Sequence, residues 1–103
     1  MIYEIKIREA SINDIPILTQ NNQALAHETE NINLQRGVLI AGISNSLDRK
    51  DCHYFVAELN GEVVGQTMIT YEWSDWRNGV MWWIQSVYVK PEHRKKRSFS
   101  IPF

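Results

Sequence analysis

Two carboxylates in a short, largely polar segment are the side chains of this sequence best suited to acid–base chemistry. Glu28 and Glu30 lie in the segment 27–33, which is predicted to be a loop. A carboxylate there can bind an ammonium group or act as a general base through a water molecule. A solvated loop without a chemical role is the simpler interpretation and is favoured. His27 does not stand at a metal-ligand spacing from the two glutamates, so we predict no metal site.

Four consecutive basic residues, Arg94 to Arg97, form the second conspicuous group. Together with His93 they match the pattern of a nuclear-localisation or nucleic-acid-binding segment. The run has no interleaved aromatic residues and no second basic patch beside it, and the chain carries a net charge of -1. Because nucleic-acid binding depends on an extended basic surface, we do not expect a nucleic acid as partner.

Aromatic residues gather in the second half of the chain, where four tryptophans occur at positions 73, 76, 82 and 83. Trp73 and Trp76 belong to a predicted hairpin tip of distinctive composition, residues 73–77, and we predict that they contact substrate. Trp82 and Trp83 are adjacent on a predicted strand, so their side chains point to opposite faces. A packed hairpin with one of the two in the core is favoured over an acceptor-site wall or an association surface, although aromatic residues dominate interface hot spots.

The elements that must position these side chains begin with a strand and two helices. The segment 3–8 alternates apolar and charged residues, which predicts a half-buried strand. Ser11 or Asn13 offers an N-cap for a first helix that is predicted to extend through Ala26. A second helix is predicted over 34–47.

Three strands are predicted to follow, over 54–59, 62–73 and 80–89, with Gly65 as a candidate bulge. Asn60-Gly61 between the first two is the strongest short hairpin signal that a sequence offers. The chain is therefore predicted to have an α+β fold in the order β-α-α-β-β-β. The last three strands would form an antiparallel meander packed on the two helices.

Composition limits the setting in which the protein works. The chain has 103 residues, 44% of them hydrophobic and 22% charged, which is typical of one globular domain. Cys52 is the only cysteine, so an internal disulfide is excluded and a reducing, cytoplasmic setting fits best. No apolar run approaches the length of a membrane-spanning helix, and the N-terminus lacks a secretory pattern, so we expect no membrane partner.

Three segments, in this order, resemble the GNAT superfamily of N-acetyltransferases. IREASINDIPIL is similar to the family's common start, and YFVAELNGEVVGQTMIT is similar to its first hairpin. IQSVYVKPEHRKK is similar to the strand that follows and to the first half of the family's cofactor loop. The resemblance covers residues 5–96 and implies the N-terminal half of that fold.

The resemblance implies transfer of an acetyl group from acetyl-CoA to a small-molecule or peptide amine, which attacks the thioester directly. It implies that main-chain groups of Val87, Tyr88 and Val89 orient the acetyl group and the pantetheine arm. An ordinary core strand is an equally good interpretation of these three residues. The resemblance also places Glu28 and Glu30 near the acceptor. Gln85 either faces the reacting centre or, as the alternation favours, points to solvent.

The family's loop pattern, Gln/Arg-x-x-Gly-x-Gly/Ala, exposes backbone N–H groups at a helix start that hold the pyrophosphate of CoA. Arg94 matches its first position. Arg97 stands where the first glycine is expected, and a side chain there disfavours the positive φ that glycine adopts easily. The residues matched to this cofactor loop are Arg94, Lys95, Lys96, Arg97, Ser98 and Phe99.

The segment 98–103 contains a proline and is not expected to form the helix that follows in the family. The sequence is therefore interpreted as a single truncated acyl-CoA N-acyltransferase-like domain over 1–103, with an aberrant basic loop and tail over 94–103 such as a frameshift produces. Two functions stay open: an acetyltransferase impaired by truncation, or a non-catalytic remnant of one. An exposed sheet edge and an uncovered apolar face predict a homodimer or larger homo-oligomer in either case.

Overall fold

The computed structural model of the chain describes residues 5–94. Its order of elements confirms the predicted β-α-α-β-β-β arrangement, with a short 3₁₀ turn before the first helix and another after the last strand. The elements are β1 (Ile5–Glu9), η1 (Ile12–Asp14), α1 (Ile15–Glu30), α2 (Arg36–Ser46), β2 (Cys52–Leu59), β3 (Glu62–Ser74), β4 (Gly79–Val89) and η2 (Pro91–His93).

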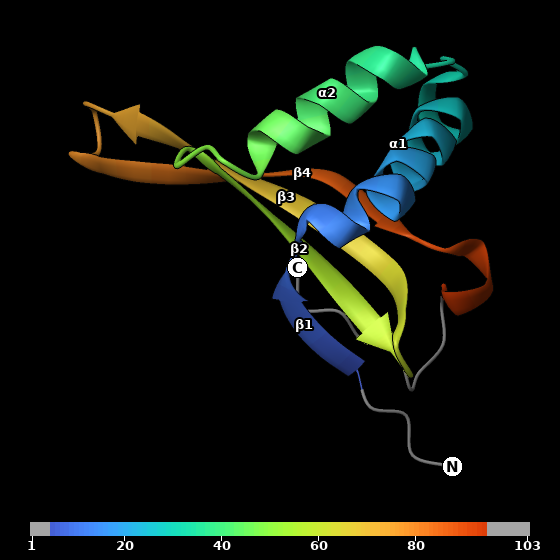
Figure 1. The fold of residues 1–103 in the computed structure, drawn as a ribbon. Coiled ribbons are helices and arrows are strands. Elements are labelled where there is room, and N and C mark those ends of the chain that lie inside the picture. The colour runs from blue at the N-terminus through green and yellow to red at the C-terminus, as the bar shows by residue number, and fades with distance from the viewer. Residues whose placement is uncertain (1–4, 95–103) are drawn as a thin grey trace.

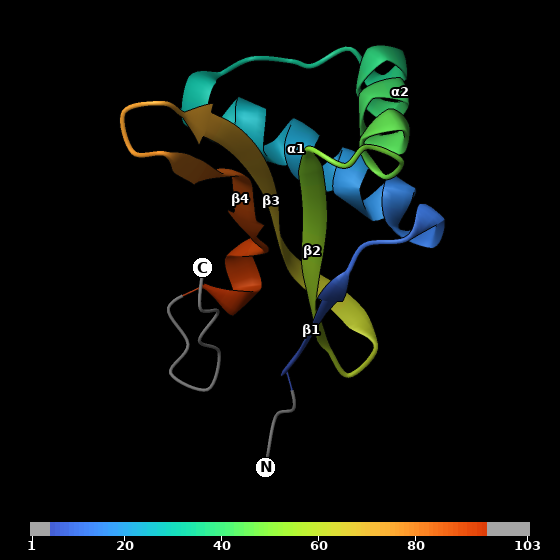
Figure 2. The same ribbon diagram turned by 90° about the vertical axis from the view of Figure 1, so that its left-hand side faces the viewer.

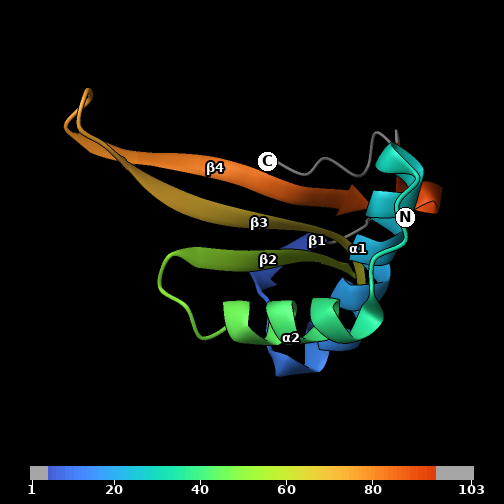
Figure 3. The same cartoon turned by 90° about the horizontal axis from the view of Figure 1, so that it is seen from above.

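The four strands form one antiparallel sheet in the order β1-β2-β3-β4. Both helices lie on one face of this sheet, and the β3–β4 hairpin extends beyond them (Figures 1 and 3). The β2–β3 turn and η2 lie at one end of the sheet, and the β3–β4 turn lies at the other (Figure 2). Neither α1 nor α2, the α-helices of the described residues, has the length and hydropathy needed to cross a membrane.

A small core joins the helices to the sheet. Leu18 of α1 and Ile43 of α2 pack against Tyr54, Val56 and Val63 of the strands, and all five are buried. Removing an aliphatic side chain of this size from water contributes about 1.5–3 kcal/mol. These few contacts fix the helices on the sheet face that carries Val56.

The first hairpin is built as the sequence predicts. Asn60 and Gly61 both have positive φ, 53° and 82°, as a two-residue turn of this type requires. The register then shifts between Ala57 and Glu58, because Ala57 pairs with Gly65 while Glu58 pairs with Val63. Val64 is therefore the extra residue of a bulge in β3, one position before the glycine that was predicted to mark it.

A second bulge lies in β4 and was not predicted. Gln66 pairs with Tyr88, but Met68 pairs with Gln85, so two residues of β4 stand opposite Thr67 alone. One of the two is Ser86, which has a φ of 54°. Positive φ is uncommon for serine, and such outliers in native structures are held in place by their surroundings.

The loop prediction for residues 27–33 is wrong in its first half. Helix α1 continues through Glu30, so Glu28 and Glu30 are helical residues. Residues 27–30 are exposed, which explains why they lack the apolar periodicity that marks a helix in sequence. The helix ends at Asn31, whose φ of 53° is the left-handed conformation that asparagine tolerates. Helix α2 lies within the predicted range of 34–47.

The first strand is half-buried, but its inward side chain is charged. Arg8 pairs with Val56 in the register, so it points toward the helices, whereas Ile7 stays 44% exposed. The predicted strand also extended to residues before Ile5, which lie outside the described residues. Alternation correctly predicted a two-faced strand, but it does not identify which face is covered.

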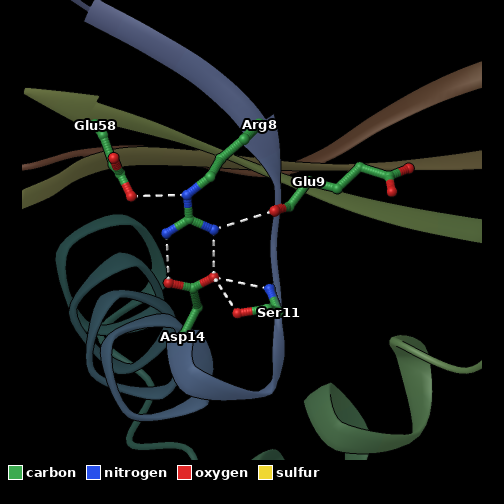
Figure 4. A network of polar contacts seen from close by, with 5 residues as sticks. All are labelled: Arg8, Glu9, Ser11, Asp14 and Glu58. Atoms are coloured by element: carbon green, nitrogen blue, oxygen red, sulfur yellow. Dashed lines mark hydrogen bonds and ion pairs between the residues drawn. The ribbon is translucent and has the colours of Figure 1, made fainter. Parts of the chain in front are cut away.

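Arg8 joins three elements through one guanidinium group (Figure 4). It donates to the Asp14 carboxylate at 2.7 and 2.9 Å and to Glu58 Oε1 at 2.7 Å. Asp14 also accepts a bond from the backbone N–H of Ser11 at 2.7 Å, which closes the turn before α1. The Asp14 side chain is only 7% exposed. The hydrogen bonds from Arg8 lower the pKa of Asp14 more than burial raises it.

We predict that Asp14→Asn lowers the free energy of unfolding at neutral pH by about 2 kcal/mol, because it leaves Arg8 half-buried and short of a charged partner. Since the folded-state pKa of Asp14 is lowered, its contribution is complete above the unfolded value of 3.8 and is lost as pH falls through the folded value. Urea unfolding at neutral pH and at about pH 3 tests both statements, because the variant should lack this part of the acid sensitivity. The control is Asp51→Asn, which breaks an exposed ion pair with Arg49. Equal losses in the two variants would contradict the prediction.

Candidate functional site

A pocket of about 480 Å³ lies between the second half of α1 and the middle of β4. It brings together residues from α1, from the connection to α2 and from the β4 bulge. The described residues that line it are Asn22, Leu25, Ala26, Thr29, Glu30, Leu34, Ile84, Gln85, Ser86 and Val87. Three of the candidate residues named from sequence, Glu30, Gln85 and Val87, therefore share one pocket.

The bulge that forms the β4 side of this pocket is held by two buried side chains of β3. Thr67 Oγ1 donates to the carbonyl of Gln85 at 3.2 Å, and Gln66 Nε2 donates to the carbonyl of Ser86 at 3.3 Å. Gln66 is fully buried and Thr67 is 2% exposed. Side chains therefore replace the regular ladder bonds where the strand bulges.

The hydroxyl of Tyr54 links α1 to the same bulge. It accepts a bond from Asn22 Nδ2 at 3.1 Å and forms a hydrogen bond with the Ser86 side chain. Asn22 Nδ2 also donates to the carbonyl of Leu18 at 2.9 Å. Burial raises the pKa of Tyr54 and outweighs the hydrogen bonds, which lower it, so the phenol stays protonated at neutral pH.

Glu28 forms a second link between α1 and the end of β4. Tyr88 Oη donates to one of its carboxylate oxygens at 2.9 Å, and Arg94 Nη1 donates to the other at 3.0 Å. Arg94 also donates through Nε to the carbonyl of Val89 at 2.7 Å, and its guanidinium lies 5.1 Å from the centre of the Tyr88 ring. Hydrogen bonds from Arg94 and Tyr88 lower the pKa of Glu28, and the bond from Arg94 has the larger effect. Glu28 is therefore an ionised structural partner rather than a solvated loop residue.

The other candidate residues lie as follows. Gln85 is exposed, as the alternation favoured, and donates to Thr70 Oγ1 at 2.7 Å. Val87 lines the pocket, while Tyr88 is buried at 6% exposure. Of the predicted cofactor loop only Arg94 is described, and Lys95, Lys96, Arg97, Ser98 and Phe99 lie outside the described residues. Among the described residues, no group of three His, Cys, Asp or Glu side chains could hold a metal ion.

Trp82 packs edge-on against Tyr71 across the hairpin, with ring centroids 5.4 Å apart, but the prediction that Trp82 or Trp83 lies in the core is wrong. Trp82 is 67% exposed and Trp83 is 48% exposed. Trp73 and Trp76, which were predicted to contact substrate, are 63% and 96% exposed on the hairpin outside the pocket. The reason is geometric: the β3–β4 hairpin extends past both helices, so nothing among the described elements covers it (Figure 3).

Sequence reasoning missed the residues that shape the bulge, namely Asn22, Tyr54, Gln66 and Ser86. One signal was present. Gln66 and Thr67 interrupt an apolar stretch of a predicted strand, and a polar residue in such a place is costly to bury unless it is hydrogen-bonded.

Comparison with known proteins agrees with this architecture. A profile of the acetyltransferase (GNAT) family matches residues 18–97. The structure of a possible acetyltransferase from Clostridium difficile 630 is 47% identical, with a TM-score of 0.83, over 89% of this chain and 61% of that one. A predicted acetyltransferase with acetyl-CoA from Clostridium acetobutylicum is 20% identical, with a TM-score of 0.73, over 89% of this chain and 64% of that one. No curated protein matches the chain significantly.

A third structure extends the likeness of fold. An integron cassette protein from the mobile metagenome of Cole Harbour Salt Marsh is 22% identical, with a TM-score of 0.81, over 89% of this chain and 60% of that one. Because the family profile covers most of the sequence, the chain belongs to the GNAT acetyltransferase family. It spans about three fifths of the length of these structural relatives.

We predict that Tyr54→Phe lowers the free energy of unfolding by about 1–2 kcal/mol, because it leaves the Asn22 amide and the Ser86 hydroxyl without their shared buried partner. Urea unfolding at neutral pH measures the loss. Tyr71→Phe, which removes a hydroxyl from a half-buried strand tyrosine, is the matched control and should change stability by less than about 0.5 kcal/mol. If the two variants were equally stable, Tyr54 would not be a structural link to the bulge.

Proposed function

We propose that the protein is an N-acetyltransferase that uses acetyl-CoA to acetylate a primary amine bound in the pocket between α1 and β4. The observation that carries this proposal is the β4 bulge. It lies in the pocket wall, on a strand with no further described strand beside it, in a chain that belongs to the GNAT family. A single buried cysteine also supports work in the reducing cytoplasm.

The described part of the proposed acetyl-CoA site fits that molecule. Strand β4 contains no charged side chain in its eleven residues, and its outer edge is open among the described strands. The main chain of Val87, Tyr88 and Val89 would hold the pantetheine arm, and Arg94 with residues 95–99 would hold the pyrophosphate. When bound, acetyl-CoA supplies the thioester that the amine attacks.

The two glutamates of α1 have different roles in this proposal. Glu28 is a poor proton acceptor because Arg94 and Tyr88 lower its pKa and occupy both of its carboxylate oxygens. Its role is to join α1 to the end of β4. Glu30 lines the pocket, where its negative charge attracts a cationic amine. The Asn22, Tyr54 and Gln66 side chains keep the bulge at Ser86 in shape.

The experiment is a calorimetric titration of the mass-verified chain with acetyl-CoA, followed by a thiol-release assay with a panel of amines. We expect saturable binding in the micromolar range and transfer to at least one amine. No heat on titration, together with no thiol release, would overturn the proposal.

Two substitutions at position 86 test the role of the bulge. Ser86→Gly preserves the positive φ and should keep transfer within about threefold, because glycine adopts this conformation easily. Ser86→Val should lower the rate by about tenfold or more, since a β-branched residue disfavours positive φ and would pull the strand back to regular geometry. Equal rates in both variants would show that the bulge has no part in transfer.

A non-catalytic protein that associates with itself through β4 is the second candidate function, and one contrast between strands favours it. The other edge strand, β1, carries three charged residues in five, which is how natural sheets protect an edge from pairing. Strand β4 carries none and exposes Val80, Trp82 and Ile84. We therefore propose that the protein forms a homodimer or larger homo-oligomer through this edge, a state that is also compatible with catalysis.

We predict that Trp82→Lys shifts the protein to the monomer, because it places a charge on the proposed contact strand. Light scattering across a dilution series measures the mass. Trp76→Lys is the control, since it adds the same charge at the hairpin tip and should leave the oligomer intact. A wild-type protein that is monomeric at micromolar concentration would refute self-association.

A further inference from the structure

The charge and shape of the pocket point to a class of acceptor. We propose that the acceptor is an aliphatic diamine, with one amine reacting at the β4 bulge and the other held as an ammonium ion by Glu30. This inference rests on the proposed function, because it takes the bulge as the place where acetyl transfer occurs. It goes beyond that function by naming the chemistry that the far end of the pocket recognises.

The first observation is the position of the pocket's carboxylate. Asn22 lies at the bulge, since its amide reaches Tyr54, which in turn bonds to Ser86. Glu30 follows Asn22 by eight residues on the same helix, so their Cα atoms lie about 12 Å apart along the axis of α1. The pocket therefore has a polar end at the bulge and an acidic end two turns further along α1.

The second observation is chemical. An amine must lose its proton before its nitrogen can attack a carbonyl carbon, and an adjacent carboxylate favours the protonated, unreactive form. A carboxylate at a distance from the bulge avoids that conflict. It stabilises a cation that stays charged throughout the reaction, which a second amino group of the acceptor provides.

The third observation is the lining between the two ends. The pocket offers apolar surface beside the polar side chains of Thr29 and Gln85. This apolar surface comes from Leu25 and Ala26 of α1, Leu34 of the connection, and Ile84 and Val87 of β4. Three of these, Leu34, Ile84 and Val87, are between 37% and 54% exposed, so a bound alkyl chain would cover them. A methylene spacer would contact these apolar groups.

The fourth observation is that the described residues lining the pocket include no cation that could pair with a carboxylate on the acceptor. Glu30 is the one charged side chain among the described residues that line the pocket. Arg94, the cation at the end of β4, does not line the pocket and forms an ion pair with Glu28. An acceptor that carries a carboxylate beside its distal amine, as lysine does, would face Glu30 with no cation to pair it. Like charges disfavour such a ligand.

The reaction balances with these components alone. The neutral amine nitrogen forms a bond to the acetyl carbon, the bond from that carbon to sulfur breaks, and the sulfur leaves as the CoA thiolate. The proton that the nitrogen loses neutralises the thiolate directly or through water. The distal ammonium takes part in no bond change.

The test compares cadaverine with amylamine, which has the same five-carbon chain but one amine, and with lysine, which adds a carboxylate. In the thiol-release assay we expect kcat/KM for cadaverine to exceed that for amylamine and lysine by about fivefold, the size of an exposed ion pair. Glu30→Gln should remove the advantage of cadaverine over amylamine, because it lowers kcat/KM for the diamine more than for the monoamine. Glu72→Gln, on the β3–β4 hairpin, is the matched control and should change neither value.

A binding measurement without acetyl-CoA separates this inference from the proposed function. NMR titration with cadaverine should shift the side-chain amide signals of Asn22 and Gln85, and Glu30→Gln should weaken binding by about fivefold. If these shifts and their dependence on Glu30 are found but no transfer occurs, the diamine pocket stands and the proposed function fails. If transfer occurs with amylamine and cadaverine equally well, or Glu30→Gln leaves cadaverine unaffected, the diamine inference is overturned while the proposed function stands.

Discussion

The ion pair between Arg8 and Asp14 fixes where α1 starts, and the contacts that α1 makes with β4 depend on that starting point. Asp14 is nearly buried, so its charge is tolerated only because Arg8 and the Ser11 N–H neutralise and solvate it. The same guanidinium holds Glu58 on β2. One side chain thus sets the end of β1, the first turn of α1 and the neighbouring strand relative to each other. A helix started elsewhere would present different residues to β4.

From that start, α1 contacts the β4 region through polar groups at two points. Near its middle, Asn22 reaches the bulge through Tyr54, and near its end Glu28 reaches Tyr88 and Arg94. Hydrogen bonds hold groups at a fixed separation, whereas apolar side chains collapse until they fill the space between them. The pocket lies along α1 in the same stretch, from Asn22 to Glu30. Polar contacts at these two points therefore keep the helix close to the strand without closing the pocket between them.

The parts of this architecture that were predictable are those with a local cause. The Asn60-Gly61 turn needs only two residues, and the strands on either side follow from alternation within a few positions. The β4 bulge has no such local mark, because Ser86 adopts positive φ in response to Gln66, Thr67 and Tyr54 on other strands. The end of α1 was missed for a related reason. Its last turn is exposed and is stabilised by the contact of Glu28 with residues 60 and 66 positions later. Long-range polar contacts of this kind leave no periodic trace in a sequence.

The two edges of the sheet differ in a way that these long-range contacts explain. Strand β1 is short and charged, and Arg8 on its inner face holds the start of α1. Strand β4 is long and uncharged, and three of its carbonyls, at Gln85, Ser86 and Val89, accept bonds from side chains of this chain. Those bonds fix the backbone of β4 in its bulged form before anything binds to its outer edge. A strand shaped in advance loses less conformational entropy on binding. The side chains that hold the bulge would therefore favour either proposed partner of β4, the pantetheine arm or a second copy of the chain.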